Sequence, residues 1–274
     1  MSPQKYTVLG AGGFIGSSLA TALRATGADC HTPARGDADI FTQKLGYVFY
    51  CIGLTADYRQ RPFDTVEAHV SLLSRILAQA SFDKLIYLSS TRLYDGMSGE
   101  KCAEDAYLIL NPANPRHLYD LSKALGENLC LTASNGRACV ARLSGVYDSS
   151  PGAPGFLSGL LQRLSREREF VIDSESGVVR DYVSLRDTVQ GLIKTSAGAE
   201  SEIINIASGE NVSNQDIADM LNAEGCKVTL QRPSARENRP LCDITKLRQL
   251  GIEPVPVRDY LRNYIKDRGS HGAH

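Results

Sequence analysis

Two residues near the middle of the chain, Tyr119 and Lys123, have types and spacing suited to proton transfer. They stand four positions apart, so a helix would place the phenol and the ammonium on one face. A free tyrosine has a pKa of about 10, too high for ready proton exchange at neutral pH, but a neighbouring cation favours the phenolate. Tyr119 could then act as proton donor or acceptor at a substrate hydroxyl or carbonyl, with Lys123 as the cation that tunes it.

A hydroxyl pair, Ser90 and Thr91, follows an apolar run at 84–89. In open α/β sheets, ligands bind beyond the carboxyl ends of the strands. A hydroxyl at that edge can hydrogen-bond a substrate carbonyl oxygen and steady it as negative charge develops. We predict this role for Ser90, with Thr91 as the second choice. The Tyr119–Lys123 spacing and the serine–threonine pair are each more often structural than catalytic when found alone. We predict a catalytic role for them because both follow a glycine-rich turn in the sequence.

That turn lies near the N-terminus, where the segment GAGGFIG separates an apolar run at 6–9 from a predicted helix at 17–25. Glycines between a strand and a helix permit a sharp turn, close approach of backbone N–H groups to a pyrophosphate, and tight helix–strand packing. We therefore predict a dinucleotide site, the alternative being an ordinary glycine-rich turn. The predicted contacts in this segment are Gly10, Gly13, Phe14, Ile15 and Gly16.

The end of the second predicted strand, at 29–32, bears on which dinucleotide is bound. An acidic residue there holds the adenosine ribose diol of NAD, whereas an arginine accommodates the 2′-phosphate of NADP. Arg35 occupies this region and favours NADP. Asp37, two positions further on, leaves NAD open, and Arg35 could also be a solvated surface residue.

Apolar runs alternate with helical segments over the first half of the chain. Further strands are predicted at 47–52, 84–89 and 139–143, and helices at 66–80 and from about 116–118 onward, the latter carrying Tyr119. Strands that are apolar on both faces and alternate with helices indicate a parallel sheet covered on both sides. We therefore predict an α/β fold, a Rossmann-type doubly wound parallel sheet, with a dinucleotide-binding domain over 1–148.

After residue 148 the pattern changes to shorter and more mixed elements. A loop at 149–155 precedes predicted strands at 203–207 and 228–230, a helix at 214–224 and a polar connection at 231–240. We expect a smaller C-terminal α/β substrate lobe over 149–268, closing over the carboxyl edge of the sheet, with some segments returning to the main sheet. A frayed tail is expected at 269–274.

Composition limits the classes of partner. The chain has 274 residues, 42% of them hydrophobic, a net charge of −1 and a pI near 6.5, which favours a full core and gives no electrostatic case for nucleic acid or acidic membranes. The apolar stretches are too short to span a bilayer. The first predicted strand begins so close to Met1 that we expect no signal peptide before it. Seven cysteines without a C-x-x-C pair or Cys/His cluster argue against zinc and for reduced thiols in a cytoplasmic protein, and we predict no metal site.

Further motifs extend this pattern over nearly the whole chain. Besides GAGGFIG, SST and YDLSK, they are RLSGVY at 142–147, RDYVSLRD at 180–187 and INIASG at 204–209. Together they resemble the extended short-chain dehydrogenase/reductase family, in particular its nucleotide-sugar epimerases, dehydratases and ketoreductases. The resemblance implies hydride transfer with a nicotinamide dinucleotide, a nucleotide-diphosphate sugar as substrate, and a homodimer formed by helices of the cofactor domain.

The resemblance also implies roles for further residues. Lys123 would hydrogen-bond the nicotinamide ribose, and Arg180 would meet the nucleotide diphosphate, the alternative for Arg180 being a pair with Asp181 or Asp187. Additional cofactor contacts are predicted at Cys51 and Gly53, and additional substrate contacts at Arg92, Tyr94 and Ser144.

Departures from the family pattern narrow the chemistry. Ser90-Thr91-Arg92 stands where the dehydratases have T-D-E, which disfavours a 4,6-dehydratase, and His69 and Gly145 replace common asparagines. The segment at 90–96, STRLYDG, is similar to that of deoxysugar 4-ketoreductases. We expect an NADP-dependent oxidoreductase acting at a sugar carbon, C4, of a nucleotide-diphosphate sugar. Alternatives are a 4-epimerase that retains NAD, a reductase of a non-sugar ketone, and a dinucleotide-binding sensor without catalysis.

Overall fold

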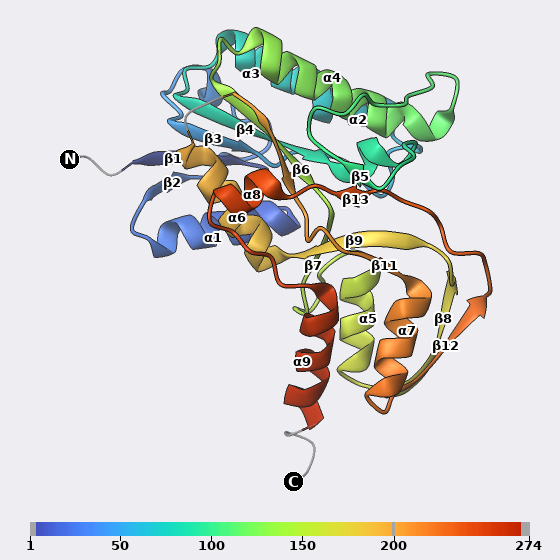
Figure 1. Cartoon of the computed structure of the whole chain (residues 1–274). Coiled ribbons are helices and arrows are strands. Elements are labelled where there is room, and N and C mark those ends of the chain that lie inside the picture. Colours follow the sequence, from blue (N-terminus) through green and yellow to red (C-terminus); the bar gives the residue numbers. More distant parts are fainter. Residues whose placement is uncertain (1–3, 199–200, 270–274) are drawn as a thin grey trace.

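A six-stranded parallel sheet forms the centre of the larger part of the molecule (Figure 1). The computed structural model describes residues 4–198 and 201–269. Across the sheet the strands follow the order β2 (Asp29–His31), β1 (Lys5–Leu9), β3 (Tyr47–Tyr50), β4 (Lys84–Ser90), β6 (Ala138–Leu143) and β10 (Ile203–Ile206). Neighbouring strands are parallel throughout. β4 and β6 are buried along their whole length, which is why their sequences are almost continuously apolar.

Helices cover both faces of this sheet (Figure 1). The helices are α1 (Phe14–Ala25) and α6 (Leu185–Ala197) on one face, and α2 (Pro62–Val66), α3 (Leu72–Gln79) and α4 (Leu118–Ala133) on the other. Among the described helices, none is long and apolar enough to cross a membrane.

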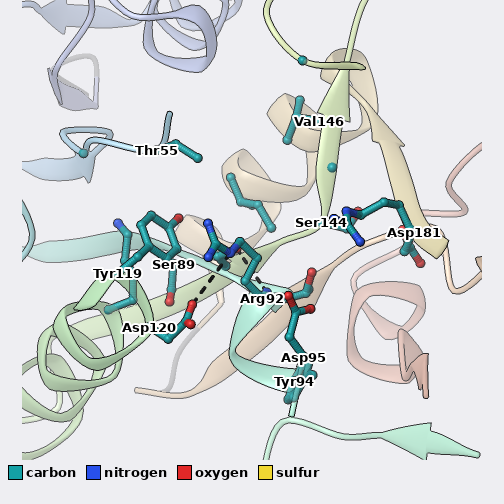
Figure 2. Close-up of a pocket in the computed structure, with 18 of the residues that line it drawn as sticks. Thr55, Ser89, Arg92, Tyr94, Asp95, Tyr119, Asp120, Ser144, Val146 and Asp181 are labelled. Carbon is teal, nitrogen blue, oxygen red and sulfur yellow. Dashed lines mark hydrogen bonds and ion pairs between the residues drawn. The ribbon is translucent and has the colours of Figure 1, made fainter. Parts of the chain in front are cut away.

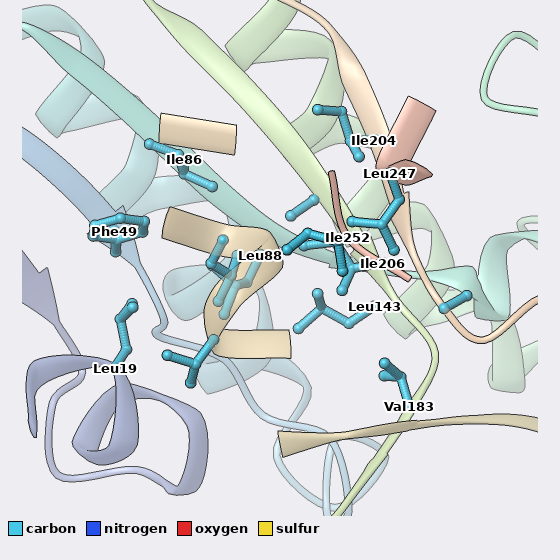
Figure 3. Close-up of a cluster of buried hydrophobic side chains, with 14 of the residues drawn as sticks. Leu19, Phe49, Ile86, Leu88, Leu143, Val183, Ile204, Ile206, Leu247 and Ile252 are labelled. Atoms are coloured by element: carbon cyan, nitrogen blue, oxygen red, sulfur yellow. The ribbon is translucent and has the colours of Figure 1, made fainter. Parts of the chain in front are cut away.

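Consecutive strand residues enter two different cores because strand side chains alternate between faces. Val8 and Phe49 belong to the cluster that includes Leu19 of α1 (Figure 3), whereas their neighbours Leu9 and Tyr50 belong to the cluster on the opposite face. Because both faces of β1 and β3 are buried, neither strand has a polar face. The predicted Rossmann-type α/β architecture is confirmed.

The order of the strands creates a crevice beside β1. The chain adds β2 on one side of β1 and then returns to add β3 on the other side. The connections that leave the carboxyl ends of β1 and β3 therefore diverge, and open α/β sheets bind ligands at such a point. The glycine turn follows β1, and Cys51 follows β3.

A smaller lobe lies below the carboxyl edge of the sheet in Figure 1. It contains β7 (Gly145–Tyr147), α5 (Phe156–Leu164), β8 (Glu169–Glu175), β9 (Val179–Ser184), β11 (Asn211–Ser213), α7 (Asn214–Ala223), β12 (Lys227–Arg232) and α9 (Val257–Gly269). These strands pair as β11-β9-β7 and β12-β8. Leu161, Ile217 and Leu261 join the helices in a separate buried cluster. The division of the chain at residue 148 stays a prediction.

Segments of the second half also return to the first. α6 and β10 join the main sheet, and α8 (Thr245–Gln249) packs against β10. A short parallel pair, β5 (Lys101–Cys102) with β13 (Leu241–Cys242), links the loop after β4 to the C-terminal part of the chain. The sequence pattern predicts segments that return to the main sheet but does not predict β5, β8 or β9. The predicted tail at 269–274 lies outside the described residues, apart from Gly269 at the end of α9.

The prediction of one continuous helix at 66–80 is wrong, because the segment is interrupted by a π-helical turn. The segment begins at Pro62 as α2, passes through a π-helical turn at Glu67–Ser71 and continues as α3. Two buried phenols explain the interruption: Tyr50 Oη donates to the Ala68 carbonyl at 2.7 Å, and Tyr87 Oη donates to the His69 carbonyl at 3.1 Å. Bonds from distant strands thus compete for these carbonyls, and π-turns of this kind often mark functional sites.

Candidate active site

A cavity of about 1100 Å³ opens between the carboxyl edge of the sheet and the smaller lobe (Figure 2). Its wall includes the glycine turn at 13–16, parts of the loop between residues 51 and 59, the segment 88–92, residues at the start of α4, and the segment 179–181 of β9. One cavity therefore joins the predicted cofactor site to the predicted reacting residues.

The glycine turn depends on the absence of side chains at two positions. Gly10 has φ +84°, and a Cβ there would lie 3.0 Å from the carbonyl carbon of Cys51. A Cβ at Gly16 would clash with the backbone oxygen of Gly10. Both glycines therefore allow β1, β3 and α1 to meet closely.

The N-terminus of α1 suits a pyrophosphate. Gly13 is its N-cap, no side chain caps the helix, and no acidic residue occurs in its first turn. Free N–H groups and the positive end of the helix dipole therefore face the cavity wall formed by Gly13, Phe14 and Ile15. The residues present fit a dinucleotide.

Lys123 is buried between the cofactor end and the sheet. Its Nζ donates a 2.7 Å hydrogen bond to the Leu88 carbonyl and lies 4.7 Å from the centre of the Tyr87 ring. Burial lowers the pKa of Lys123 to about 7.

The loop after β3 passes close to Lys123 at Gly53. A Cβ at Gly53 would lie 3.4 Å from the Lys123 ammonium and 3.2 Å from His69 Nε2. Gly53 thus lets the loop after β3 pass close to both side chains, beside Cys51, whose pKa burial raises to about 12.

Tyr119 lies one turn before Lys123 on α4 and is 4% exposed. Burial raises the pKa of its phenol, while the side chains of Ser90 and Thr55 and the charge of Arg92 lower it. The Arg92 guanidinium carbon lies 4.5 Å from the centre of the Tyr119 ring. Arg92 is therefore a cation that acts directly on the phenol. Motif spacing does not predict this contact, because the two residues are distant in sequence and lie on different elements. The tuning role of Lys123 stays a prediction.

Ser90 is placed where a substrate oxygen could meet Tyr119. It ends β4, and its Oγ accepts a 3.2 Å hydrogen bond from the Arg92 backbone N–H, capping the 3-10 turn at Thr91–Tyr94. Because the oxygen is the acceptor there, the hydroxyl hydrogen remains able to donate elsewhere. The predicted roles of Ser90 and Thr91, both of which line the cavity, rest on this placement.

Polar atoms without partners also line the cavity. Among the described residues, Ser89 Oγ and Asp120 Oδ1 are buried and lack a hydrogen-bond partner. Ser144, a predicted substrate contact, also lines the cavity and lies beside the Asp181 carboxyl group. Buried polar atoms are rarely left unpaired in native proteins unless a ligand or water satisfies them. These two atoms leave hydrogen-bonding capacity at the cavity wall for a polar ligand or a water molecule, and the sequence motifs predicted neither residue as a contact.

The predicted contacts Tyr94 and Arg180 have partners of their own. Tyr94 Oη donates to Asn205 Oδ1 and accepts from Arg142 Nη1, both at 2.8 Å, so its phenol is bound within the protein. Arg180 pairs with neither Asp181 nor Asp187; its Nη1 donates to the Val179 carbonyl at 2.8 Å and lies 3.7 Å from Glu237 Oε2. Arg180 therefore does not form the ion pair with Asp181 or Asp187 that was the alternative to a diphosphate contact.

His69 links the cofactor end to α4. Its Nε2 accepts from the Leu54 backbone N–H at 3.2 Å, so Nδ1 carries the proton and donates to Ser122 Oγ at 2.8 Å. The ring lies edge-on to that of Tyr119, with ring centres 5.2 Å apart. Burial, reinforced by Lys123, lowers the pKa of His69 to about 2, so the ring stays neutral. His69 thus packs against Tyr119 and connects the loop after β3 to α4.

Arg35 lies on the exposed loop after β2, outside the cavity wall. Asp37, the other residue considered for cofactor choice, uses Oδ1 to accept from the Asp39 backbone N–H at 2.9 Å and caps the turn at Ala38–Phe41. No group of three or more His, Cys, Asp or Glu side chains in the described ranges could hold a metal ion.

The fold and the cavity define a dinucleotide-binding α/β protein with a tyrosine, a lysine and a serine at its sheet edge. Residues 6–207 match the model of the NAD dependent epimerase/dehydratase family, and the chain belongs to that family. The predicted family resemblance is thereby confirmed.

Individual relatives are distant in sequence. The dTDP-4-dehydrorhamnose reductase of Streptomyces griseus is 24% identical over 292 residues, covering 93% of this chain and 91% of that protein. The UDP-glucuronic acid 4-epimerase of Bacillus cereus, solved with UDP-glucuronic acid and NAD, is 21% identical, with a TM-score of 0.75 and coverage of 96% and 99%. RMD from Pseudomonas aeruginosa, solved with NADPH, is 19% identical, with a TM-score of 0.75 and coverage of 96% and 98%.

Proposed function

We propose that the protein is a nicotinamide-dinucleotide-dependent oxidoreductase that transfers a hydride at C4 of a nucleotide-diphosphate sugar. The observation that carries this proposal is the single cavity that joins the glycine turn to Tyr119, Ser90 and Lys123. Family membership and relatives that act on nucleotide sugars support it.

The dinucleotide would be held at its pyrophosphate by the N-terminus of α1, with Lys123 near the nicotinamide ribose. When bound, the nicotinamide supplies the hydride donor or acceptor. Gly10 and Gly16 keep the turn tight, and Cys51 and Gly53 form the neighbouring wall. These residues would leave the nicotinamide end of the site open towards Tyr119.

The protein's own part in the reaction is proton transfer at the substrate oxygen. In the direction of reduction, the Tyr119 phenol gives its proton to the carbonyl oxygen as a hydride reaches the carbon, and the Ser90 hydroxyl hydrogen-bonds the same oxygen. Burial raises the pKa of Tyr119 and keeps it protonated, which suits it to act as an acid. Arg92 limits the cost of the phenolate that results, because its guanidinium lies over the ring.

We further propose NADP as the cofactor, with Arg35 at the 2′-phosphate. Support comes from the free, exposed position of Arg35 and from Asp37, whose carboxylate is engaged as a cap. Comparing the Kd of NADPH and NADH in the wild type and in Arg35→Ala tests this choice. A loss of NADPH affinity alone supports it, and equal losses contradict it.

A 4-epimerase with retained NAD is the second candidate, favoured by the Bacillus cereus structure. Incubation of the purified protein with a 4-keto sugar nucleotide and NADPH separates the two. Stoichiometric loss of NADPH absorbance identifies a reductase. Isomerisation of a sugar nucleotide without that loss identifies an epimerase.

We also propose a homodimer and a cytoplasmic location. Exposed apolar side chains on α2 and α4, namely Phe63, Val66 and Leu125, support a contact between copies through these helices. The seven cysteines, all of which lie in the described residues, form no disulfide with one another, which suits a reducing compartment. Light scattering of the wild type and of Phe63→Ser with Leu125→Ser tests the dimer, which the double substitution should weaken.

A further inference from the structure

Arg92 presents a guanidinium to the cavity with most of its hydrogen-bond donors unused. Nη2 lies 3.5 Å from Tyr58 Oη, at the limit of a hydrogen bond, and Nε lies 3.8 Å from Asp120 Oδ1, which is beyond it. The side chain is 35% exposed and stacks between the rings of Tyr58 and Tyr119, 5.3 Å and 4.5 Å from their centres. Aromatic contacts therefore help to hold the guanidinium in place, and most of its five N–H groups have no close acceptor among the described residues.

Asp120 is the counter-ion of this fork, and Figure 2 marks the ion pair between the two side chains, but the 3.8 Å between Nε and Oδ1 is too long for a hydrogen bond. Its side chain is 9% exposed, and Oδ1 is buried without a hydrogen-bond partner. Burial raises the pKa of Asp120, which weakens its hold on the positive charge of Arg92. The other nearby carboxylate, Asp95, is paired with Arg239. The described residues therefore leave the Arg92 fork without a bidentate partner.

The position of Arg92 relates it to one part of the sugar, and this step rests on the proposed function. If Tyr119 exchanges a proton with the oxygen on C4, the substituent of the adjacent ring carbon C5 begins two bonds from the reacting carbon. The guanidinium carbon of Arg92 lies 4.5 Å from the centre of the Tyr119 ring and the side chain lines the cavity, which makes Arg92 a candidate partner for that substituent. The C5 substituent is a neutral hydroxymethyl group in a hexose and a carboxylate in a uronic acid.

We infer that Arg92 binds a carboxylate of the substrate and that the substrate is a nucleotide-diphosphate uronic acid. A carboxylate satisfies the fork through two parallel hydrogen bonds, the geometry that arginine favours. A hydroxymethyl group offers one weak acceptor and leaves the remaining donors desolvated. Because a buried charge left unpaired is penalised more than a neutral contact is rewarded, the site discriminates against the neutral sugar.

Calorimetric titration measures this discrimination without turnover. The ligands are two matched pairs, UDP-glucuronic acid with UDP-glucose and GDP-mannuronic acid with GDP-mannose. For the pair whose nucleotide fits, the uronic acid should bind on the order of 100-fold more tightly, the preference expected of a charge-assisted bidentate contact.

Three variants locate the preference. Arg92→Gln should abolish it by weakening the uronic acid alone, and Arg92→Lys should leave an intermediate preference because lysine keeps the charge without the fork. Arg61→Gln, which removes an exposed arginine paired with Asp57 and Asp64 outside the cavity wall, should keep the full preference. Thermal melting and NADP binding confirm that each variant is folded.

The outcomes separate the inference from the proposed function. Equal affinity for both members of a pair, or a preference that survives Arg92→Gln, overturns the inference while leaving a nucleotide-sugar site in place. Failure of every nucleotide sugar to bind the folded, NADP-binding protein overturns both.

Discussion

The ammonium of Lys123 donates a 2.7 Å hydrogen bond to the backbone carbonyl of Leu88, two residues before Ser90. This bond ties α4, which carries Tyr119, to the carboxyl end of β4. Helix and strand therefore bring the phenol and the serine hydroxyl to one wall of the cavity. The same arrangement buries the Lys123 ammonium, which makes the free energy of unfolding depend on pH.

Replacement of Lys123 should change how stability depends on pH. Its pKa is lowered from 10.5 to about 7 in the folded protein, so between these values the unfolded chain binds the proton that the folded chain has released. The free energy of unfolding therefore rises with pH across this window, by up to about 1.4 kcal/mol per pH unit. Lys123→Met should remove this rise in the cofactor-free protein.

Urea unfolding at pH 7, 8 and 9 measures the effect. Lys44→Met, at a lysine whose side chain is 67% exposed, serves as the control and should retain the wild-type slope. A Lys123→Met variant with the same slope as the wild type contradicts a depressed pKa at this residue.

His69 should make the protein sensitive to acid. Its pKa falls from 6.5 to about 2 on folding, so below pH 6.5 the unfolded chain gains a proton that the folded chain does not. Stability is then lost by up to about 1.4 kcal/mol per pH unit as pH falls. His69→Asn removes the titrating ring, so the difference in Tm between pH 7.5 and pH 4.5 should shrink. An unchanged difference would mean that His69 titrates normally.

The glycine turn offers a matched pair of substitutions. A Cβ at Gly16 meets the Gly10 backbone oxygen, whereas a Cβ at Gly12 meets nothing within 4 Å. Overpacking of this kind costs about 1–3 kcal/mol, so Gly16→Ala should weaken dinucleotide binding by about 10- to 100-fold. Gly12→Ala should bind almost as the wild type does. Fluorescence titration with NADPH compares them, and equal losses would place the dinucleotide elsewhere.

A buried ion pair behind the active site should dominate the stability of this region. Arg142 Nη2 and Nε bind Glu127 at 2.7 Å and 2.9 Å, and Arg142 Nη1 donates to Tyr94 Oη. Arg142→Met leaves the Glu127 carboxylate buried and unpaired, which should cost about 3–5 kcal/mol in urea unfolding. Adding Glu127→Gln should recover part of this loss, and no recovery would contradict the pairing.

The main sheet could be predicted because its strands are apolar on both faces, as in β4 and β6. β8 was missed: Phe170 and Ile172 are buried, but Val171 between them is 46% exposed, which obscures the alternation. The π-turn at 67–71 was also missed, because the Tyr50 and Tyr87 phenols that hydrogen-bond its carbonyls come from other strands. Local periodicity carries no information about such contacts.

The site was predicted in part: its motif residues were identified from the sequence, but their contacts with residues on other elements were not. Motif spacing indicated Tyr119, Lys123 and Ser90 individually, and the parallel sheet brings them to one edge. The contact of Arg92 with the Tyr119 ring depends on how the turn after β4 is oriented, which spacing does not reveal. Asp120 was missed because an acidic residue beside a tyrosine gives no sign that it will be buried.

Tyr119→Phe tests whether Tyr119 handles the substrate proton. With a 4-keto sugar nucleotide and NADPH, we expect a kcat lowered by about 100- to 10,000-fold, since general acid catalysis contributes that much. The Kd of NADPH should stay within about twofold of the wild type, because ring burial and packing are retained. A kcat equal to that of the wild type would contradict the claim and favour a dinucleotide-binding sensor.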